Sequence, residues 1–218
     1  MKRLRVGVLA SGSGTNLQAL LDAGAHEGAP YEVAVVISNV AAAYATVRAQ
    51  IARVPTELIE HNKLPDRDAF ERALAEALER HGVELVCLAG FMRLLGAAFL
   101  SRFPGRVINI HPALLPAFPG MHAVRQALER GVKVAGCTVH FVDAGMDTGP
   151  IVAQAAVPVL AGDDEAALAA RILAEEHKLY PQVVRLVAEG RVRLEGRRVQ
   201  VDAAPGQGPL SLENPGGA

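Results

Sequence analysis

Short apolar runs alternate along the first half of the chain with longer stretches that carry apolar residues at helical spacing. The runs that predict strands are Arg5–Ala10, Val33–Ser38, Thr56–Ile59, Leu85–Leu88 and Val107–Ile110. Residues 68–81 are one helical stretch, with these apolar residues on one face: Phe70, Leu74, Ala77 and Leu78. We therefore expect an α/β fold with a Rossmann-like, mostly parallel sheet and helices on both faces. Such sheets bind ligands at the carboxyl ends of their strands.

The pattern changes in the second half of the chain. Thr138–Val142 and Ile151–Val159 predict two more strands, separated by residues 143–150, which are rich in turn-forming residues. Residues 163–180 predict one long helix.

The last part of the chain predicts a hairpin and a tail. Arg191–Leu194 and Arg197–Val201 flank Glu195-Gly196 and predict two paired strands. Residues 203–218 are rich in Pro and Gly and predict a disordered tail.

Composition places the chain among globular proteins. Of its 218 residues, 50% are hydrophobic, and the formal net charge is −1. A chain of this size buries a full core, so we expect a single α/β domain at residues 1–202 rather than two domains. The near-neutral charge argues against a general nucleic-acid binder, which normally carries a basic face.

Neither a signal segment nor a membrane span is expected. The basic N-terminus leads into the short apolar run Val6–Ala10, which breaks into glycines and serines. A membrane span needs about 18 uninterrupted apolar residues, and the sequence holds no such run. Cys87 and Cys137 are far apart in apolar surroundings, which predicts buried free thiols in a reducing cytosol and no metal site.

Two polar residues with complementary chemistry lie at the end of the fifth predicted strand. Alternate side chains of a strand share a face, so Asn109 and His111 point to one side while Ile108 and Ile110 point to the other. A carboxamide can donate a hydrogen bond to an oxyanion and an imidazole can move a proton, which suits acyl or formyl transfer. Alternatively, Asn109 caps the strand end and His111 is a half-buried, hydrogen-bonded histidine.

The segment after the first strand, Ala10–Asn16, is rich in Gly and Ser. Glycines let the backbone turn tightly, and the exposed amides of a helix N-terminus favour an anion, typically a phosphate. A dinucleotide site does not fit, because Leu17 stands where the third glycine is required and no acidic residue follows the second strand. The Gly-Lys-Ser/Thr ending of a Walker motif is missing as well. The alternative is a glycine-rich turn with an Asn or Thr cap.

Three further stretches carry candidate chemistry. Residues 88–95 follow the fourth strand. They either form the bottom of a pocket for a flat ring or pack in the core. Asp147 is the carboxylate that we expect beside His111, where it favours the imidazolium form, unless it only caps its own turn. The run Glu175-Glu176-His177 lacks the spacing of helical metal ligands and predicts a solvated or substrate-facing edge.

Five separated motifs follow one another along the chain: SGSGTN, AGFMRLL, INIHPALLPAFPG, GCTVHFVDAGMDTGPI and EEHKLYP. Together they closely resemble the phosphoribosylglycinamide formyltransferases, the folate-dependent glycinamide ribonucleotide transformylases of purine synthesis, over about residues 4–201. The resemblance implies the formyltransferase fold, with a phosphate-binding N-terminal half and a folate-binding C-terminal half. It implies formyl transfer from the co-substrate 10-formyltetrahydrofolate to the amine of glycinamide ribonucleotide, without metal, nicotinamide or ATP.

The resemblance also implies roles for individual residues. Asn109, His111 and Asp147 would form the catalytic trio. The residues that would contact glycinamide ribonucleotide are Gly14, Thr15, Asn16, Leu173, Ala174, Glu175 and Glu176. The residues that would contact the formyl folate are Arg67, Met92, Arg93, Leu94, Leu95, Asn109, Asp143, Ala144, Gly145, Met146 and Asp147.

The chain departs from the family pattern at three positions. Thr15 replaces a usual serine and keeps the hydroxyl, Ala117 replaces a commonly basic residue, and Thr148 stands at a commonly glycine position. These changes leave the trio intact. The implied chemistry is attack of the amine on the formyl carbon, with the oxyanion stabilised by Asn109 and by a His111 that Asp147 keeps charged.

Three other protein classes share part of this pattern. Methionyl-tRNA formyltransferases carry an additional C-terminal domain and formyltetrahydrofolate hydrolases usually an N-terminal regulatory domain, and we expect neither domain here. A non-enzymatic phosphate- or nucleotide-binding module needs only SGSGTN and leaves the trio without a shared role. We expect a cytoplasmic monomer or homodimer with small-molecule substrates and without nucleic-acid or membrane partners.

Overall fold

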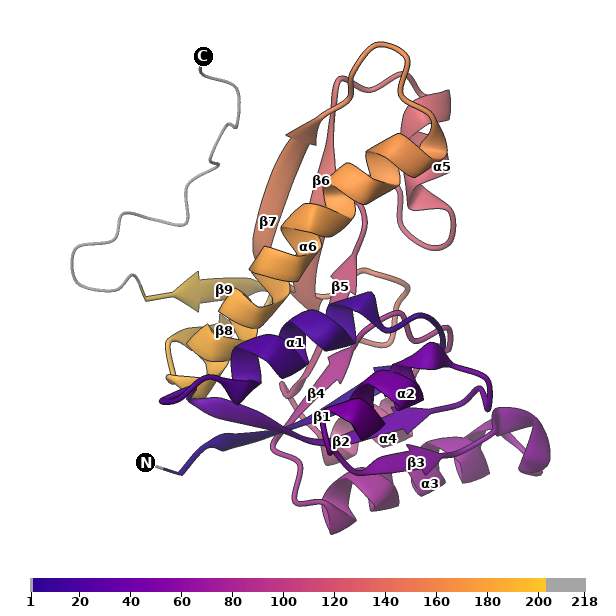
Figure 1. The fold of residues 1–218 in the computed structure, drawn as a ribbon, viewed down its shortest axis with the longest axis vertical. Helices are drawn as coiled ribbons and strands as arrows, with labels where there is room; N and C mark the ends of the chain where they lie inside the picture. Colours follow the sequence, from indigo (N-terminus) through magenta and orange to yellow (C-terminus); the bar gives the residue numbers. More distant parts are fainter. Residues whose placement is uncertain (1, 203–218) are drawn as a thin grey trace.

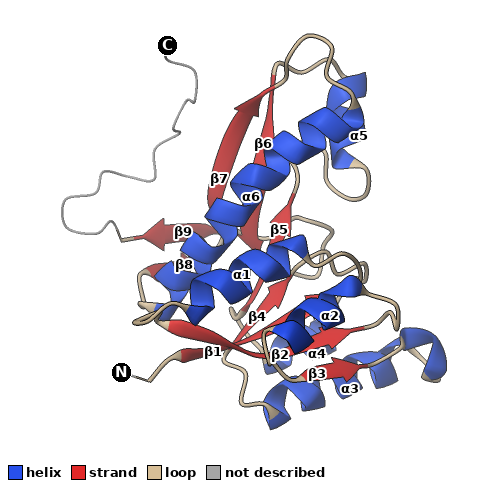
Figure 2. Ribbon diagram, in the orientation of Figure 1, coloured by secondary structure: helices blue, strands red, loops and turns tan. Residues whose placement is uncertain are grey.

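The protein folds around a seven-stranded sheet, and the computed structural model describes residues 2–202 (Figures 1 and 2). The strands are β1 Leu4–Ala10, β2 Tyr31–Ser38, β3 Thr56–Leu58, β4 Leu85–Leu88, β5 Val107–His111, β6 Val134–Phe141 and β7 Ile151–Pro158. Their order is β3-β2-β1-β4-β5-β6-β7. Strands β1 to β5 run parallel to one another, and β6 and β7 pair antiparallel. The prediction of a mostly parallel sheet is confirmed.

Helices cover both faces of this sheet, as predicted. They are α1 Thr15–Ala25, α2 Tyr44–Ile51, α3 Arg67–Arg80, α4 Ala97–Arg102, α5 Ala123–Glu129 and α6 Glu165–Ala188, with a 3₁₀ turn at His61–Lys63. Helices α1, α2 and α6 contribute Leu17, Ala45 and Leu168 to the core on one face. Helices α3 and α4 contribute Phe70 and Phe99 to the core on the other face. In Figure 1, α1 and α6 lie in front of the sheet.

Strand β5 separates the two cores and directs its polar residues to one face. Ile108 and Ile110 belong to the core beneath α1 and α6, whereas Val107 belongs to the core beneath α3 and α4. Because side chains alternate along a strand, Asn109 and His111 point away from α1 and α6. The predicted facing of these residues agrees with the structure.

The predicted end of the long helix is wrong. Helix α6 continues through Pro181 to Ala188, because Val183 and Val184 extend its buried apolar face beyond the proline. Pro181 has no N–H to donate to the carbonyl of His177, so the helix loses one hydrogen bond there, which the packing of its buried face offsets.

The predicted start of β6 is also wrong. The strand begins at Val134 rather than at Thr138. A β-carbon on Gly136 would lie 2.0 Å from the carbonyl oxygen of Ala155, so only glycine lets β6 and β7 pair here. Glycine weakens the sequence signal of a strand, which is why this half of β6 escaped prediction.

The end of the chain forms the predicted hairpin. Strands β8 Val192–Glu195 and β9 Arg198–Val201 pair antiparallel in a separate two-stranded sheet. The predicted tail at residues 203–218 lies outside the described residues. Cys87 and Cys137 are free and buried, as predicted, and burial raises the pKa of each thiol to about 12. Within residues 2–202, no helix is long and apolar enough to cross a membrane.

The carboxyl ends of three parallel strands open onto one edge of the sheet. Strands β1, β4 and β5 are neighbours, and the loops that follow them cover residues 11–14, 89–96 and 112–122. The strand order turns back between β1 and β4, and α/β sheets bind ligands at such a switch point. Three of the motifs found in the sequence therefore meet at this edge.

Candidate active site

His111 lies at the end of β5, only 5% exposed, with hydrogen-bond acceptors at both ring nitrogens. Its Nε2 lies 2.8 Å from the carbonyl oxygen of Phe118, and its Nδ1 lies 3.4 Å from Oδ2 of Asp147. A carbonyl and a carboxylate only accept hydrogen bonds, so a ring protonated on both nitrogens satisfies both contacts. The geometry therefore suits an imidazolium held between two oxygen atoms.

Asp147 reaches His111 from the loop between β6 and β7. Its Oδ2 also accepts a 2.8 Å hydrogen bond from the backbone N–H of Gly120, which fixes the carboxylate against the loop after β5. Asp147 has φ 54°, in the left-handed region that Asp tolerates better than most residues. The structure thus brings the three predicted catalytic residues, Asn109, His111 and Asp147, to one place.

His140 on β6 joins this cluster, although no pattern in the sequence assigned it a function. It pairs with Asn109 across the antiparallel β5 and β6, and the register of β6 against β7 shifts at His140. Its Nδ1 donates to the carbonyl oxygen of Phe141 (2.9 Å), and its Nε2 lies 3.2 Å from Nδ2 of Asn109 and 3.6 Å from Oδ1 of Asp147. Burial lowers the pKa of His140. The ring is therefore neutral and accepts a hydrogen bond from the Asn109 amide.

The loop after β5 is held by buried polar contacts. The hydroxyl of Thr138 donates to the carbonyl oxygen of Ala113 (2.6 Å) and accepts from the N–H of Leu115 (3.0 Å). The side-chain amide of Gln154 donates to the carbonyl oxygen of Leu115 (2.9 Å). These bonds anchor the segment whose Phe118 carbonyl faces His111.

The glycine-rich loop ends where α1 begins. Gly14 has φ 70°, and a β-carbon on it would lie 2.7 Å from the Cα of Ala45, so only glycine fits this position. Gly14 offers no side chain to the first amides of the helix, which lack acceptors within the helix itself. Arg48 of α2 adds a positive charge here, because its Nε donates to the carbonyl oxygen of Ser13 (2.8 Å). The amides and the guanidinium together suit a phosphate.

Helix α6 brings Glu176 to the same loop. The carboxylate is 5% exposed and accepts a 2.7 Å hydrogen bond from Nδ2 of Asn16, and burial raises its pKa. Oδ1 of Asn16 and Nε2 of His177 are buried and have no hydrogen-bond partner among the described residues. Burial and the charge of Arg48 lower the pKa of His177. The buried hydrogen bond between Asn16 and Glu176 therefore joins α6 to the glycine-rich loop.

The other predicted α6 residues lie beside Glu176. Leu173 and Glu175 are half-buried and Ala174 is exposed. Glu175 pairs with Lys178 at 2.9 Å, so its carboxylate has a partner on its own helix. Within residues 2–202, no group of three or more His, Cys, Asp and Glu side chains could hold a metal ion.

The loop after β4 is tied to the glycine-rich loop and presents apolar side chains. The N–H of Met92 donates to the hydroxyl of Ser11 (2.9 Å). Met92 and Leu94 are 68% and 55% exposed, whereas Leu95 is buried. Arg67 donates to the carbonyl oxygen of Leu94 (3.2 Å). Arg93 is exposed beside them.

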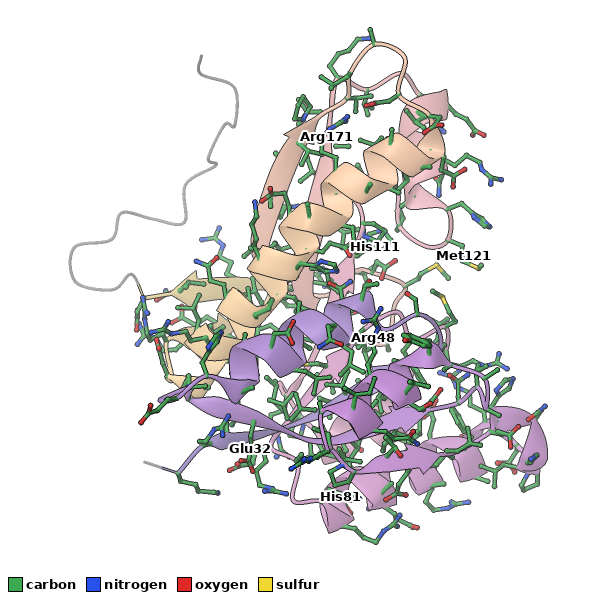
Figure 3. All side chains as sticks on the ribbon, in the orientation of Figure 1. Glu32, Arg48, His81, His111, Met121 and Arg171 are labelled. Carbon is green, nitrogen blue, oxygen red and sulfur yellow. The ribbon has the colours of Figure 1, made fainter. Side chains whose placement is uncertain are left out.

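Two methionines extend this exposed apolar surface. Met121 projects from the loop between β5 and α5 (Figure 3) and is 70% exposed, and Met146 is 50% exposed. Met146 lies in the loop that also holds Asp143, Ala144 and Gly145. Exposed apolar side chains from three loops suit the binding of a flat ring near Asp147.

A sequence profile of the formyl transferase family matches residues 4–184. The phosphoribosylglycinamide formyltransferase of Mycobacterium tuberculosis (strain CDC 1551 / Oshkosh) is 50% identical over 193 residues, which cover 88% of this chain and 89% of that protein. The trifunctional purine biosynthetic protein adenosine-3 of Drosophila pseudoobscura pseudoobscura is 49% identical over 193 residues, covering 88% of this chain. The chain spans only 14% of the length of that trifunctional relative.

Solved structures show the same similarity in three dimensions. Glycinamide ribonucleotide transformylase 1 from Symbiobacterium toebii matches with a TM-score of 0.90 and 59% identity, covering 91% of this chain and 94% of that chain. A formyltetrahydrofolate deformylase from Pseudomonas syringae pv. tomato matches with a TM-score of 0.85 and 27% identity, covering 92% of this chain and 66% of that chain.

Proposed function

Because the chain belongs to the formyl transferase family, we propose that it transfers the formyl group of 10-formyltetrahydrofolate to the amine of glycinamide ribonucleotide. The products are formyl-glycinamide ribonucleotide and tetrahydrofolate, in de novo purine (IMP) biosynthesis. The resemblance carried by the five motifs is confirmed by relatives that match over nearly their whole length. The main support from the geometry is the contact of His111 with Asp147 at the edge where β1, β4 and β5 end.

The glycinamide ribonucleotide would bind along α1 and α6. Its phosphate would accept hydrogen bonds from the amides at Gly14–Asn16 and lie near the guanidinium of Arg48, which the loop already holds. Its ribose hydroxyls would lie beside Glu176, with Leu173–Glu175 as neighbours on the helix. Glu176 supports this assignment because it is a buried carboxylate that contacts the phosphate loop through Asn16.

The formyl folate would bind between the loops after β4 and β6. The pterin would lie against the exposed apolar side chains of Met92 and Leu94, and main-chain groups of Met92–Leu95 and Asp143–Asp147 would contact its polar edge. Arg67 would contact the same co-substrate, since its side chain already reaches the carbonyl of Leu94. The residues present therefore fit the co-substrate that the family implies.

The catalytic residues would act on the oxyanion that develops when the amine attacks the formyl carbon. The Asn109 amide donates one N–H to His140, which leaves its second N–H for the oxyanion. His111, charged and held by Asp147 at Nδ1, would donate beside it from Nε2, whose N–H would turn from the carbonyl oxygen of Phe118 to the oxyanion. The amine loses a proton and the leaving folate nitrogen gains one, with His111 or an ordered water as the carrier. Holding both substrates in one site makes the attack effectively unimolecular.

The change in folate absorbance tests this function directly. Purified protein is mixed with 10-formyltetrahydrofolate, with and without glycinamide ribonucleotide, and His111→Ala serves as the control protein. We expect turnover only with the ribonucleotide, and a loss of roughly 10²–10⁴-fold in the variant. Turnover without the ribonucleotide would indicate removal of the formyl group from the folate, and the similar Pseudomonas syringae structure is named a formyltetrahydrofolate deformylase. Silence in both mixtures would reject the transfer reaction.

A further inference from the structure

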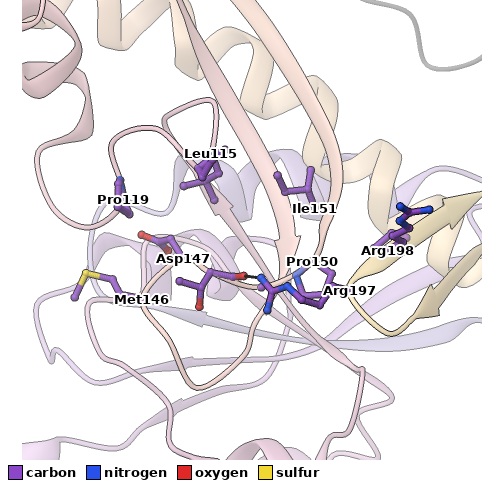
Figure 4. Close-up of a pocket in the computed structure, with 12 residues that line it drawn as sticks. Leu115, Pro119, Met146, Asp147, Pro150, Ile151, Arg197 and Arg198 are labelled. Atoms are coloured by element: carbon purple, nitrogen blue, oxygen red, sulfur yellow. Dashed lines mark hydrogen bonds between the residues drawn. The ribbon is translucent and has the colours of Figure 1, made fainter.

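The turn of the terminal hairpin contacts the loop that carries Asp147. Nη2 of Arg197 donates to the carbonyl oxygen of Thr148 over 2.7 Å, and Nη1 lies 3.9 Å from Oδ2 of Asp143. Figure 4 shows the first contact as a dashed line beside Asp147. One guanidinium thus reaches both ends of the segment Asp143–Thr148.

The same segment is closed by its own hydrogen bonds. Oδ1 of Asp143 accepts from the N–H of Gly145 (3.1 Å) and from the hydroxyl of Thr148 (2.6 Å). The second oxygen of Asp143 faces Arg197. The carboxylate therefore joins the internal bonds of the loop to the external contact.

Close backbone approaches make this loop a compact unit. A β-carbon on Gly145 would lie 2.0 Å from Oγ1 of Thr148, and one on Gly149 would lie 1.7 Å from the carbonyl oxygen of Phe141. A segment packed this tightly has few ways to deform within itself. We therefore expect a displacement of Thr148 to displace Asp147 as well.

A cavity separates the loop from the hairpin beside this contact. It has a volume of about 540 Å³ and is lined by Asp147 and Thr148 of the loop and by Arg197, Arg198 and Val199 of the hairpin. Figure 4 labels Asp147, Arg197 and Arg198. Within residues 2–202, the hydrogen bond between the hairpin turn and the loop comes from Arg197. The loop is therefore supported from this side mainly by one guanidinium.

We propose that Arg197 is a positioning residue, which holds the Asp143–Thr148 loop so that the carboxylate of Asp147 stays on His111. This role rests on the proposed formyl transfer. The side chain of Arg197 is 76% exposed, and exposed ion pairs add little to the free energy of unfolding. If Arg197 positions the loop, its replacement should lower the activity and leave the stability nearly unchanged. If the contact has no role, its replacement should change neither the activity nor the stability.

The test replaces Arg197 and measures kinetics, melting temperature and amide exchange. In Arg197→Ala we expect kcat/KM for the formyl folate to fall roughly fivefold to tenfold, which corresponds to about 1–1.4 kcal/mol, the net contribution of an ordinary hydrogen bond. KM for glycinamide ribonucleotide and the melting temperature should stay at their wild-type values. Amides of residues 143–148 should exchange faster, and Arg197→Lys should recover part of the loss.

Arg193→Ala is the matched control, because Arg193 is an exposed arginine of the same hairpin whose 2.8 Å ion pair with Asp202 stays at the hairpin. It should match the wild type in all three measurements. Unchanged exchange of residues 143–148 in Arg197→Ala would overturn the proposal whether or not the enzyme turns over. An equal loss in Arg193→Ala would overturn it as well, since the hairpin as a whole would then be responsible. A wild type without turnover would instead reject the proposed function.

Discussion

His140 contacts the proposed catalytic residues through a directed hydrogen bond rather than through a charge. Its Nδ1–H is committed to the carbonyl of Phe141, so Nε2 carries a lone pair that accepts from the Asn109 amide. Burial, which lowers the pKa of His140, keeps the ring neutral. The ring therefore decides which way the Asn109 amide turns, and with it where the second N–H points.

Replacing His140 tests this positioning. We expect His140→Ala to lower kcat roughly tenfold, the effect of about 1.4 kcal/mol, with both KM values nearly unchanged. His140→Gln should recover much of the loss, because its side-chain oxygen can accept from Asn109. The pH–rate profile should keep its shape in both variants, since a neutral ring supplies no proton. A lost acid limb in His140→Ala would contradict this role.

The buried carboxylate of Glu176, on the proposed ribonucleotide side of the site, destabilises the folded protein when it is ionised. Burial raises its pKa, so its ionised form is disfavoured in the folded protein. The stability linked to this group is full below the unfolded pKa of about 4.3 and is lost as the pH rises through the folded pKa. The native carboxylate therefore lowers the free energy of unfolding at neutral pH.

Glu176→Gln should relieve this cost and weaken substrate binding. The glutamine oxygen can still accept from Asn16, while the charge is gone. We expect a higher melting temperature at pH 7, by about 2–4 °C for each kcal/mol gained, and little difference near pH 4. KM for glycinamide ribonucleotide should rise roughly tenfold, since hydrogen bonds to charged groups are the stronger ones. A lower melting temperature at pH 7 would show that the charge stabilises the fold.

The site residues that could be predicted from the sequence are those that belong to a local sequence pattern. Strand alternation placed Asn109 and His111 on one face, and the turn-rich loop drew attention to Asp147. His140 and Arg48 were not selected, because their partners are set by strand pairing and by the packing of α2 beside the glycine-rich loop. Such contacts between distant segments leave no periodic signal in the chain.

The start of α1 depends on how closely α2 approaches it. The Cα of Ala45 would lie 2.7 Å from a β-carbon at position 14, and Gly14 also has φ 70°. The contact with Ala45 and the positive φ both disfavour a side chain at position 14. This position directly precedes the first backbone amides of α1, which have no acceptor within the helix. The geometry of the proposed phosphate site therefore depends on this single glycine.

Gly14→Ala and Gly12→Ala form a matched pair for this element. Gly14→Ala should lower the free energy of unfolding by about 1–3 kcal/mol, because the left-handed conformation and the contact with Ala45 both become strained. It should raise KM for glycinamide ribonucleotide more than KM for the formyl folate. At Gly12 a β-carbon would meet nothing within 4 Å, so Gly12→Ala should melt like the wild type. Equal melting temperatures of all three proteins would contradict this account.

The predicted boundaries of helices and strands agree with the structure where the apolar runs are uninterrupted. The parallel strands of the first half are bounded by turn residues and were found nearly in place, whereas α6 and β6 were misjudged at Pro181 and Gly136. Both residues oppose regular structure locally, and tertiary packing overrides them: buried valines continue α6, and β7 pairs with β6.

At the scale of the whole molecule, one buried tyrosine joins the helix layer to the strands of the site. Tyr180 of α6 is fully buried, and its hydroxyl lies 3.0 Å from the carbonyl oxygen of Leu88 and 3.1 Å from that of Ile108. Those carbonyls belong to β4 and β5, which lead into the proposed folate loop and to His111. Burial raises the pKa of Tyr180 far above its usual value, so the hydroxyl stays protonated at any working pH.

Tyr180→Phe should therefore affect both stability and catalysis. Loss of the hydrogen bond should cost about 1–2 kcal/mol and lower the melting temperature by a few degrees, equally at pH 6 and pH 9. Because the hydroxyl links the ends of β4 and β5, kcat/KM should also fall severalfold.

Tyr31→Phe is the control that separates these two effects. Tyr31 is 1% exposed, and its hydroxyl donates to the carbonyl oxygen of Leu20 in α1 over 3.0 Å, so the same atom is removed from an equally buried bond. Its partner belongs to α1 rather than to the strands that carry the site. We expect a similar drop in melting temperature with unchanged kinetics. If both variants keep full activity, the bond of Tyr180 serves stability alone, and the alignment of β4 and β5 is fixed by the sheet itself.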